Sequence, residues 1–114
     1  MKKYVRLFLI AFLVLGIFGC DNKKTKEPTE SSLAFKKEYE ALNGKTNASG
    51  KEHRNLNINE VNPFEKTTTE ELIKKIEAGE TLYVYFGDPL CPWCRSVLEK
   101  AIEVANEKGI DKIY

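Results

Sequence analysis

The sequence lacks an excess of either positive or negative charge. Its 114 residues include 18 Lys and Arg and 17 Asp and Glu, which leaves a formal net charge of +1. A nucleic-acid-binding domain carries a basic surface that binds phosphates, so this composition gives no reason to expect nucleic acid as a partner. The length leaves room for one folded domain at most.

Metal-ligating residues are scarce as well. The histidine is His53, and the cysteines are Cys20, Cys91 and Cys94. A tetrahedral zinc site needs four ligands, which this set supplies only if Cys20 takes part, and the motif around Cys20 indicates another use. We therefore expect no metal and no cofactor. His53 stands in a polar loop and is expected to be solvated.

The apolar run at residues 7–18 is too short for a comfortable membrane span. It follows the basic segment 1–6, and a spanning helix needs about 20 residues. Its length and flanks are typical of a secretory signal peptide over residues 1–19; a plain signal anchor is the alternative. Residues 17–20, Ile-Phe-Gly-Cys, resemble the lipobox of bacterial lipoproteins, which implies that Cys20 is lipidated.

A lipidated Cys20 places the protein on the cell membrane, facing outside the cytoplasm, where disulfides persist. Residues 20–32 are polar and are expected to be a flexible tether. Residues 33–55 are expected to form a helix over 33–42 and then a polar linker. Residues 56–114 are expected to form the domain.

The elements expected in residues 56–114 alternate between strand and helix. Short apolar or alternating runs predict strands at 56–58, 82–86 and 110–114. Two helical patterns have both a start and a stop signal: Thr68 to Gly79 and Cys91 to Gly109. The order β-α-β-α-β predicts an α/β fold with parallel strands. Because the last strand pattern stops at Tyr114, we expect a truncated sequence in which the C-terminal half of the fold is missing.

The second helical pattern begins with Cys91-Pro92-Trp93-Cys94-Arg95. If Cys91 is the N-cap, Pro92 takes the first helical position, and the free N–H groups of the first turn point at the Cys91 sulfur. These donors and the helix dipole predict a lowered pKa for Cys91. Cys94 shares the helix face of Cys91 and can close a disulfide with it.

This spacing predicts a thiol–disulfide redox site. We expect Cys91 to be the attacking thiol and Cys94 the resolving thiol. Trp93 is expected to shape access to the sulfur, and Arg95 to add positive charge close by. Two inert structural cysteines, or half of a zinc site, are the alternatives.

Residues 82–94 resemble the active-site strand, turn and helix start of the thioredoxin superfamily. Residues 62–64, 84–87 and 91–95 are similar to secreted thioredoxin-like lipoproteins of Gram-positive bacteria, some of them labelled bacteriocin transport accessory proteins. The sequence departs from thioredoxin at Tyr85, where thioredoxin has a buried acidic residue.

The resemblance implies a thioredoxin-like fold and a membrane-anchored thiol–disulfide oxidoreductase. It also implies exported thiol or disulfide proteins as substrates, and a membrane redox partner. The alternative is a non-catalytic accessory or binding module for peptide export. An intact Cys91 and Cys94 pair favours the enzyme.

The lipobox motif generates a prediction about Cys20. Cys20→Ala should release the protein from the membrane or leave an uncleaved precursor, because the acyl acceptor is gone. Thiol labelling at Cys91 should not change. Membrane fractionation checks the first statement, and loss of disulfide exchange in a soluble Cys20→Ala protein would contradict the second.

Overall fold

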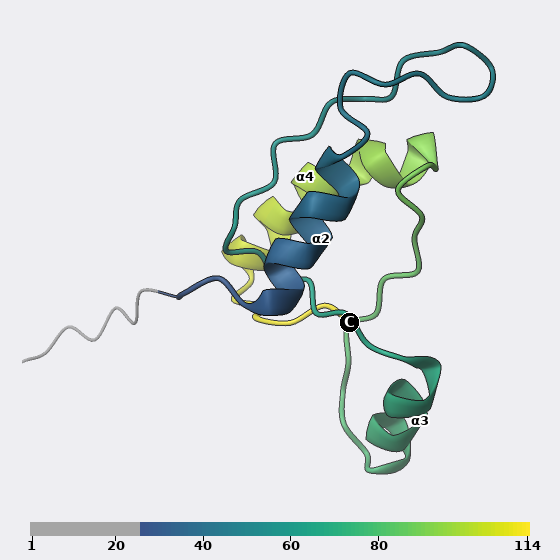
Figure 1. Ribbon diagram of the computed structural model, residues 1–114. Coiled ribbons are helices and arrows are strands. Elements are labelled where there is room, and N and C mark those ends of the chain that lie inside the picture. The colour runs from purple at the N-terminus through teal and green to yellow at the C-terminus, as the bar shows by residue number, and fades with distance from the viewer. Residues whose placement is uncertain (1–25) are drawn as a thin grey trace, which may run out of the picture.

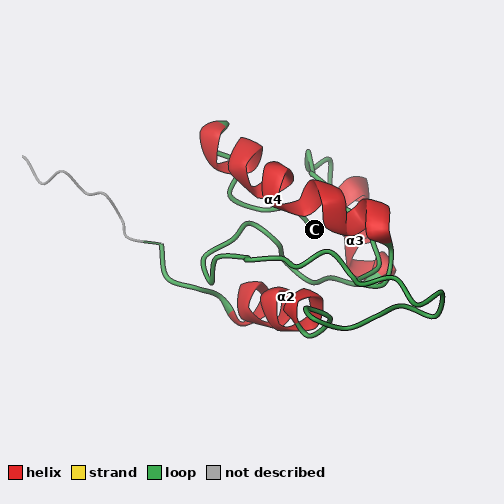
Figure 2. Ribbon diagram, turned by 90° about the horizontal axis from the view of Figure 1, so that it is seen from above, coloured by secondary structure: helices red, strands yellow, loops and turns green. Residues whose placement is uncertain are grey.

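A computed structural model describes residues 26–114 of the chain. Its helices are α2 (Glu30–Glu40), α3 (Thr69–Glu77) and α4 (Pro92–Glu107). Extended segments run between α2 on one side and α3 and α4 on the other (Figure 2). The end of the chain lies between α3 and the other two helices (Figure 1).

The helix boundaries follow from local capping. Thr29 caps α2, and its side chain accepts a hydrogen bond from the Ser32 N–H at 3.0 Å. The helix therefore begins at Glu30, inside the stretch 20–32 that was expected to be a tether. Thr68 caps α3 in the same way and pairs with Glu71, as its sequence predicts.

The predicted α/β fold is wrong. Within residues 26–114 the structure has three helices and no strands, so it lacks the β-α-β-α-β core of a thioredoxin-like domain. Phe64 and Ile113 form a single parallel bridge. The Tyr114 N–H also donates to the Tyr83 carbonyl at 2.8 Å, and the Tyr85 N–H donates to the Tyr114 carbonyl at 2.6 Å. These contacts do not extend into consecutive bridges.

Side chains take the place of strand partners at residues 56–58. The Asn43 side chain both donates to and accepts from the backbone of Leu56, at 2.7 and 2.9 Å. The Ile58 N–H donates to the Glu40 carboxylate at 2.7 Å, and its carbonyl accepts from Lys36 at 2.6 Å. Because these backbone groups are already paired, the segment needs no neighbouring strand.

Residues 82–86 depart from the prediction for a different reason. A parallel strand is normally buried on both faces. Here Val84 is 38% exposed and Phe86 is 82% exposed. The aromatic and β-branched composition of the run indicated burial, but within the described part of the chain nothing covers both of its faces.

The core lies between α2 and α4. Its buried residues come from both helices and from the extended segments between them: Phe35, Tyr39, Leu56, Ile58, Phe64, Leu98 and Ile102. The rings of Phe35 and Phe64 stack with their centroids 4.0 Å apart. Tyr85 packs edge-on against Phe64 at 5.4 Å. Residues 33–55 and 56–114 therefore share one core.

Candidate functional site

Cys91 lies at the start of α4, where its sequence predicts it. It is the N-cap residue, and Pro92 is the first residue of the helix. The Cys91 Sγ accepts a hydrogen bond from the Cys94 N–H at 3.4 Å. The sulfur thus occupies the position in which the side chain of a good N-cap satisfies a free helical donor.

A short turn leads into this helix start. The Leu90 N–H donates to the Asp88 carboxylate at 2.7 Å, and the Cys91 N–H donates to the Asp88 carbonyl at 3.0 Å. An aspartate that binds the backbone two residues ahead favours such a turn. Asp88 thereby fixes the direction in which the chain enters Cys91.

Both thiols are free and partly exposed. The pKa of Cys94 is lowered. The backbone N–H of Asp88 lowers it most, followed by the Cys91 thiol; partial burial opposes them, and the Tyr85 hydroxyl lowers it further. Hydrogen-bond donors at the sulfur favour the charged form of a thiol. The sequence indicated a stabilised thiolate at the helix start but not this set of donors around Cys94.

Arg95, which was expected to add positive charge beside the cysteines, lies inside the fold. Its side chain is fully buried, and its guanidinium directs its hydrogen bonds to groups of the surrounding fold rather than to a sulfur. Nε and Nη2 donate to the Arg54 carbonyl at 3.0 and 2.6 Å. Nη1 donates to the carbonyls of Tyr39 and Pro89 at 2.7 and 3.3 Å.

The fifth donor of Arg95 binds the Asn43 side-chain oxygen at 3.0 Å. A guanidinium has five N–H donors, so every one of them is used. All four acceptor groups are neutral, and burial lowers the pKa of Arg95. Arg95 therefore joins the C-terminal end of α2, the loop at Arg54 and the turn before Cys91.

Trp93 and its apolar neighbours are on the surface. Trp93 is 81% exposed, Leu90 is 61% exposed and Phe86 is 82% exposed. Leu90 precedes Cys91 and Trp93 follows it by two residues, so two exposed apolar side chains belong to the segment that carries the cysteines. Whether Trp93 shapes access to the sulfur stays a prediction.

His53 is buried, contrary to the expectation that it is solvated. His53 is 6% exposed, and its backbone N–H donates to the Lys45 carbonyl at 2.9 Å. The next carbonyl, that of Arg54, is the one that Arg95 binds twice. The polar composition of this loop gave no indication that His53 is buried against the fold.

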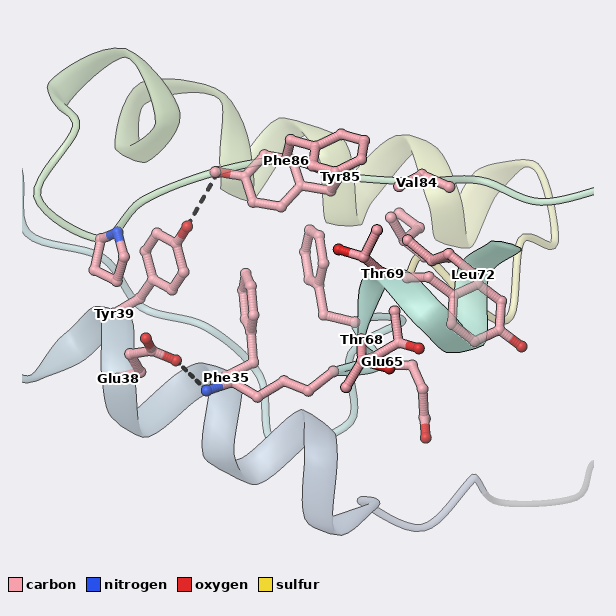
Figure 3. Close-up of a pocket in the computed structure, with 17 residues that line it drawn as sticks. Phe35, Glu38, Tyr39, Glu65, Thr68, Thr69, Leu72, Val84, Tyr85 and Phe86 are labelled. Atoms are coloured by element: carbon pink, nitrogen blue, oxygen red, sulfur yellow. Dashed lines mark hydrogen bonds and ion pairs between the residues drawn. The ribbon is translucent and has the colours of Figure 1, made fainter. Parts of the chain in front are cut away.

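A cavity of about 430 Å³ opens beside residues 84–87. Phe35, Tyr39, Leu72 and Tyr85 are among its lining residues, and Figure 3 shows the hydroxyls of Tyr39 and Tyr85 facing each other at its edge. Tyr39 is the residue of this region that sequence reasoning missed as part of the site. Its spacing in the helix indicated only core packing.

Among residues 26–114, no three His, Cys, Asp or Glu side chains group closely enough to hold a metal ion. A helix of the length and apolarity needed to cross a bilayer is also absent from this part of the chain. Cys20 and the signal-peptide segment lie outside the described residues.

Comparison with known proteins yields no relatives. No family model, no curated protein and no solved structure matches this chain. The resemblance to the thioredoxin superfamily therefore stays a prediction, and the chemistry of the site rests on its own geometry.

The burial of Arg95 generates a prediction about stability. Arg95→Met should lower the free energy of unfolding by about 3–5 kcal/mol, because it leaves a set of buried acceptors without their donors. Urea denaturation followed by circular dichroism measures the change. Arg54→Ala is the matched control. It removes an exposed ion pair with Glu99 but keeps the backbone carbonyl, so it should cost about 1 kcal/mol or less. Equal losses in both variants would contradict the role given to Arg95.

Proposed function

We propose that Cys91 and Cys94 form a thiol–disulfide exchange site and that the protein is an oxidoreductase. The observation that carries the proposal is the position of Cys91 as the N-cap of α4, with its Sγ 3.4 Å from the Cys94 nitrogen. Free, partly exposed thiols three residues apart on one helix start are arranged for reversible pairing.

In the reducing direction, the Cys91 thiolate attacks one sulfur of a substrate disulfide. The substrate S–S bond breaks, a mixed disulfide with Cys91 forms, and the other substrate sulfur leaves as a thiolate and takes up a proton. The Cys94 thiolate then attacks the Cys91 sulfur and releases the second substrate thiolate. The substrate gains two electrons, and the Cys91–Cys94 disulfide holds the oxidised state. The oxidising direction is the reverse.

The lowered pKa of Cys94 supports the second step. A resolving thiol must be a thiolate when it attacks, and a stabilised thiolate is also the better leaving group in the reverse direction. The bonds from Arg95 to Pro89 and Tyr39 hold the turn before Cys91 against α2. These bonds position the turn that enters the helix carrying both cysteines.

The proposed setting comes from the sequence. The signal-peptide pattern and the lipobox support export and anchoring through Cys20, outside the cytoplasm. Exported proteins with thiols or disulfides are then the substrates, and a membrane redox partner resets the pair. The competing proposal is a binding module for peptide export. The exposed Leu90 and Trp93, in the segment that carries the cysteines, are the observation that favours it.

A trapping experiment tests the exchange site. In the full chain, Cys94→Ser should accumulate a covalent mixed disulfide at Cys91, because the thiol that resolves it is gone. Cys91→Ser should accumulate little. Non-reducing gels and peptide mapping identify the linked sulfur, which also distinguishes it from Cys20.

The control is the double variant in which both cysteines are serine, which should trap nothing at this site. Equal trapping by the two single variants would overturn the assignment of roles. The absence of any mixed disulfide in either variant would favour the binding module.

A further inference from the structure

Asp88 makes two hydrogen bonds to the backbone immediately before α4. Its carboxylate oxygen Oδ1 accepts from the Leu90 N–H at 2.7 Å, and its carbonyl accepts from the Cys91 N–H at 3.0 Å. An Asp or Asn side chain that binds the backbone two residues ahead forms a turn of this kind. Both Cys91 and the residue before it are therefore tied to position 88.

The turn has a second support on its other side. The Pro89 carbonyl accepts from Arg95 at 3.3 Å, and the proline ring restricts the backbone there. Beyond the turn, the Cys91 Sγ accepts from the Cys94 N–H at 3.4 Å. Arg95 is fully buried, whereas Asp88 is exposed. The Asp88 side chain can therefore be exchanged without altering the packing of the core.

The charge of Asp88 does not favour a thiolate nearby. Within residues 26–114 its carboxylate forms no salt bridge with a Lys, Arg or His side chain. The pKa of Cys94 is lowered, first by the Asp88 backbone N–H, but the Asp88 carboxylate opposes this and raises it. A negative charge disfavours a second one close by. The side chain can help the cysteine pair only through the hydrogen bond that it accepts.

We infer that Asp88 is a positioning residue for thiol–disulfide exchange, whose carboxylate prepares Cys91 to pair with Cys94 by accepting the Leu90 N–H and not through its charge. The inference rests on the proposed function of the Cys91–Cys94 pair. It names the side chain that orders the pair before the disulfide closes.

Disulfide closure requires one relative orientation of the two cysteines. In the parent protein the turn is already ordered in the dithiol form, so little freedom is lost when the S–S bond forms. Without the side-chain acceptor the turn loosens in the dithiol form and has to be ordered during closure. Removing a side chain that accepts from a backbone N–H at a helix start changes an equilibrium by about fivefold.

The test compares Asp88→Asn with Asp88→Ala in the full chain. Both variants remove the charge, and only asparagine keeps an oxygen that can accept the Leu90 N–H. Each protein is equilibrated with reduced and oxidised glutathione. Closure forms the Cys91–Cys94 bond, consumes one oxidised glutathione and releases two reduced glutathione molecules. Alkylation and peptide mass spectrometry measure the closed fraction. The equilibrium constant for closure should be about fivefold smaller in Asp88→Ala than in Asp88→Asn.

Two further measurements separate positioning from a general loss of structure. Asp88→Ser supplies a weaker acceptor for the same turn, so its closure constant should lie between those of the other two variants. In urea the difference between Asp88→Asn and Asp88→Ala should disappear, because the turn is not formed in the unfolded chain.

Glu103 provides the matched control on the same helix. Its carboxylate pairs with Lys100 on the surface and lies outside the turn before Cys91. Glu103→Gln and Glu103→Ala make the same two chemical changes as the Asp88 variants, and their closure constants should agree with each other.

The outcomes separate this inference from the proposed function. Equal closure by Asp88→Asn and Asp88→Ala, with mixed disulfides still trapped at Cys91, overturns the role of Asp88 alone. A difference between them that persists in urea also overturns it. The expected difference without any trapped mixed disulfide supports the role of Asp88 in closing the pair and overturns the exchange function.

Discussion

The buried guanidinium of Arg95 is the constraint on which the rest of the structure depends. A charge can be buried only when its donors are satisfied, and here five donors reach four neutral acceptors on separate parts of the chain. The end of α2, the loop at Arg54 and the turn at Pro89 must all be in place at once. The turn that leads to Cys91 is therefore tied to the end of α2 and to the loop at Arg54.

Tyr39 connects this constraint to the core. Its carbonyl accepts from Arg95, its ring packs against Phe35, and its hydroxyl meets that of Tyr85. A single residue of α2 thus contributes to the contacts of Arg95, to the core and to the tyrosine pair.

The sequence correctly predicted helix caps, which depend on residues close together in the chain. The Thr68 cap, Pro92 in the first turn of α4 and Cys91 as its N-cap depend on neighbouring residues alone, and the structure confirms them. The sequence could not predict features that depend on contacts between residues far apart in the chain. The segment 56–58 is paired with side chains of α2 and of Asn43, which follows α2, instead of a strand. Arg95 and His53 are buried although they are charged or polar. His53 was expected to be solvated because its loop is polar, and Arg95 was expected to add positive charge beside the cysteines.

The reduction potential of the Cys91–Cys94 pair tests the central claim most directly. The full chain is equilibrated with glutathione buffers of graded ratio, and the disulfide is quantified by alkylation and peptide mass spectrometry. The donors around Cys94 stabilise the reduced form, so the account predicts one two-electron transition at a potential above the roughly −270 mV of thioredoxin. A pair that forms no Cys91–Cys94 disulfide in any buffer, or one at or below that potential, would contradict it.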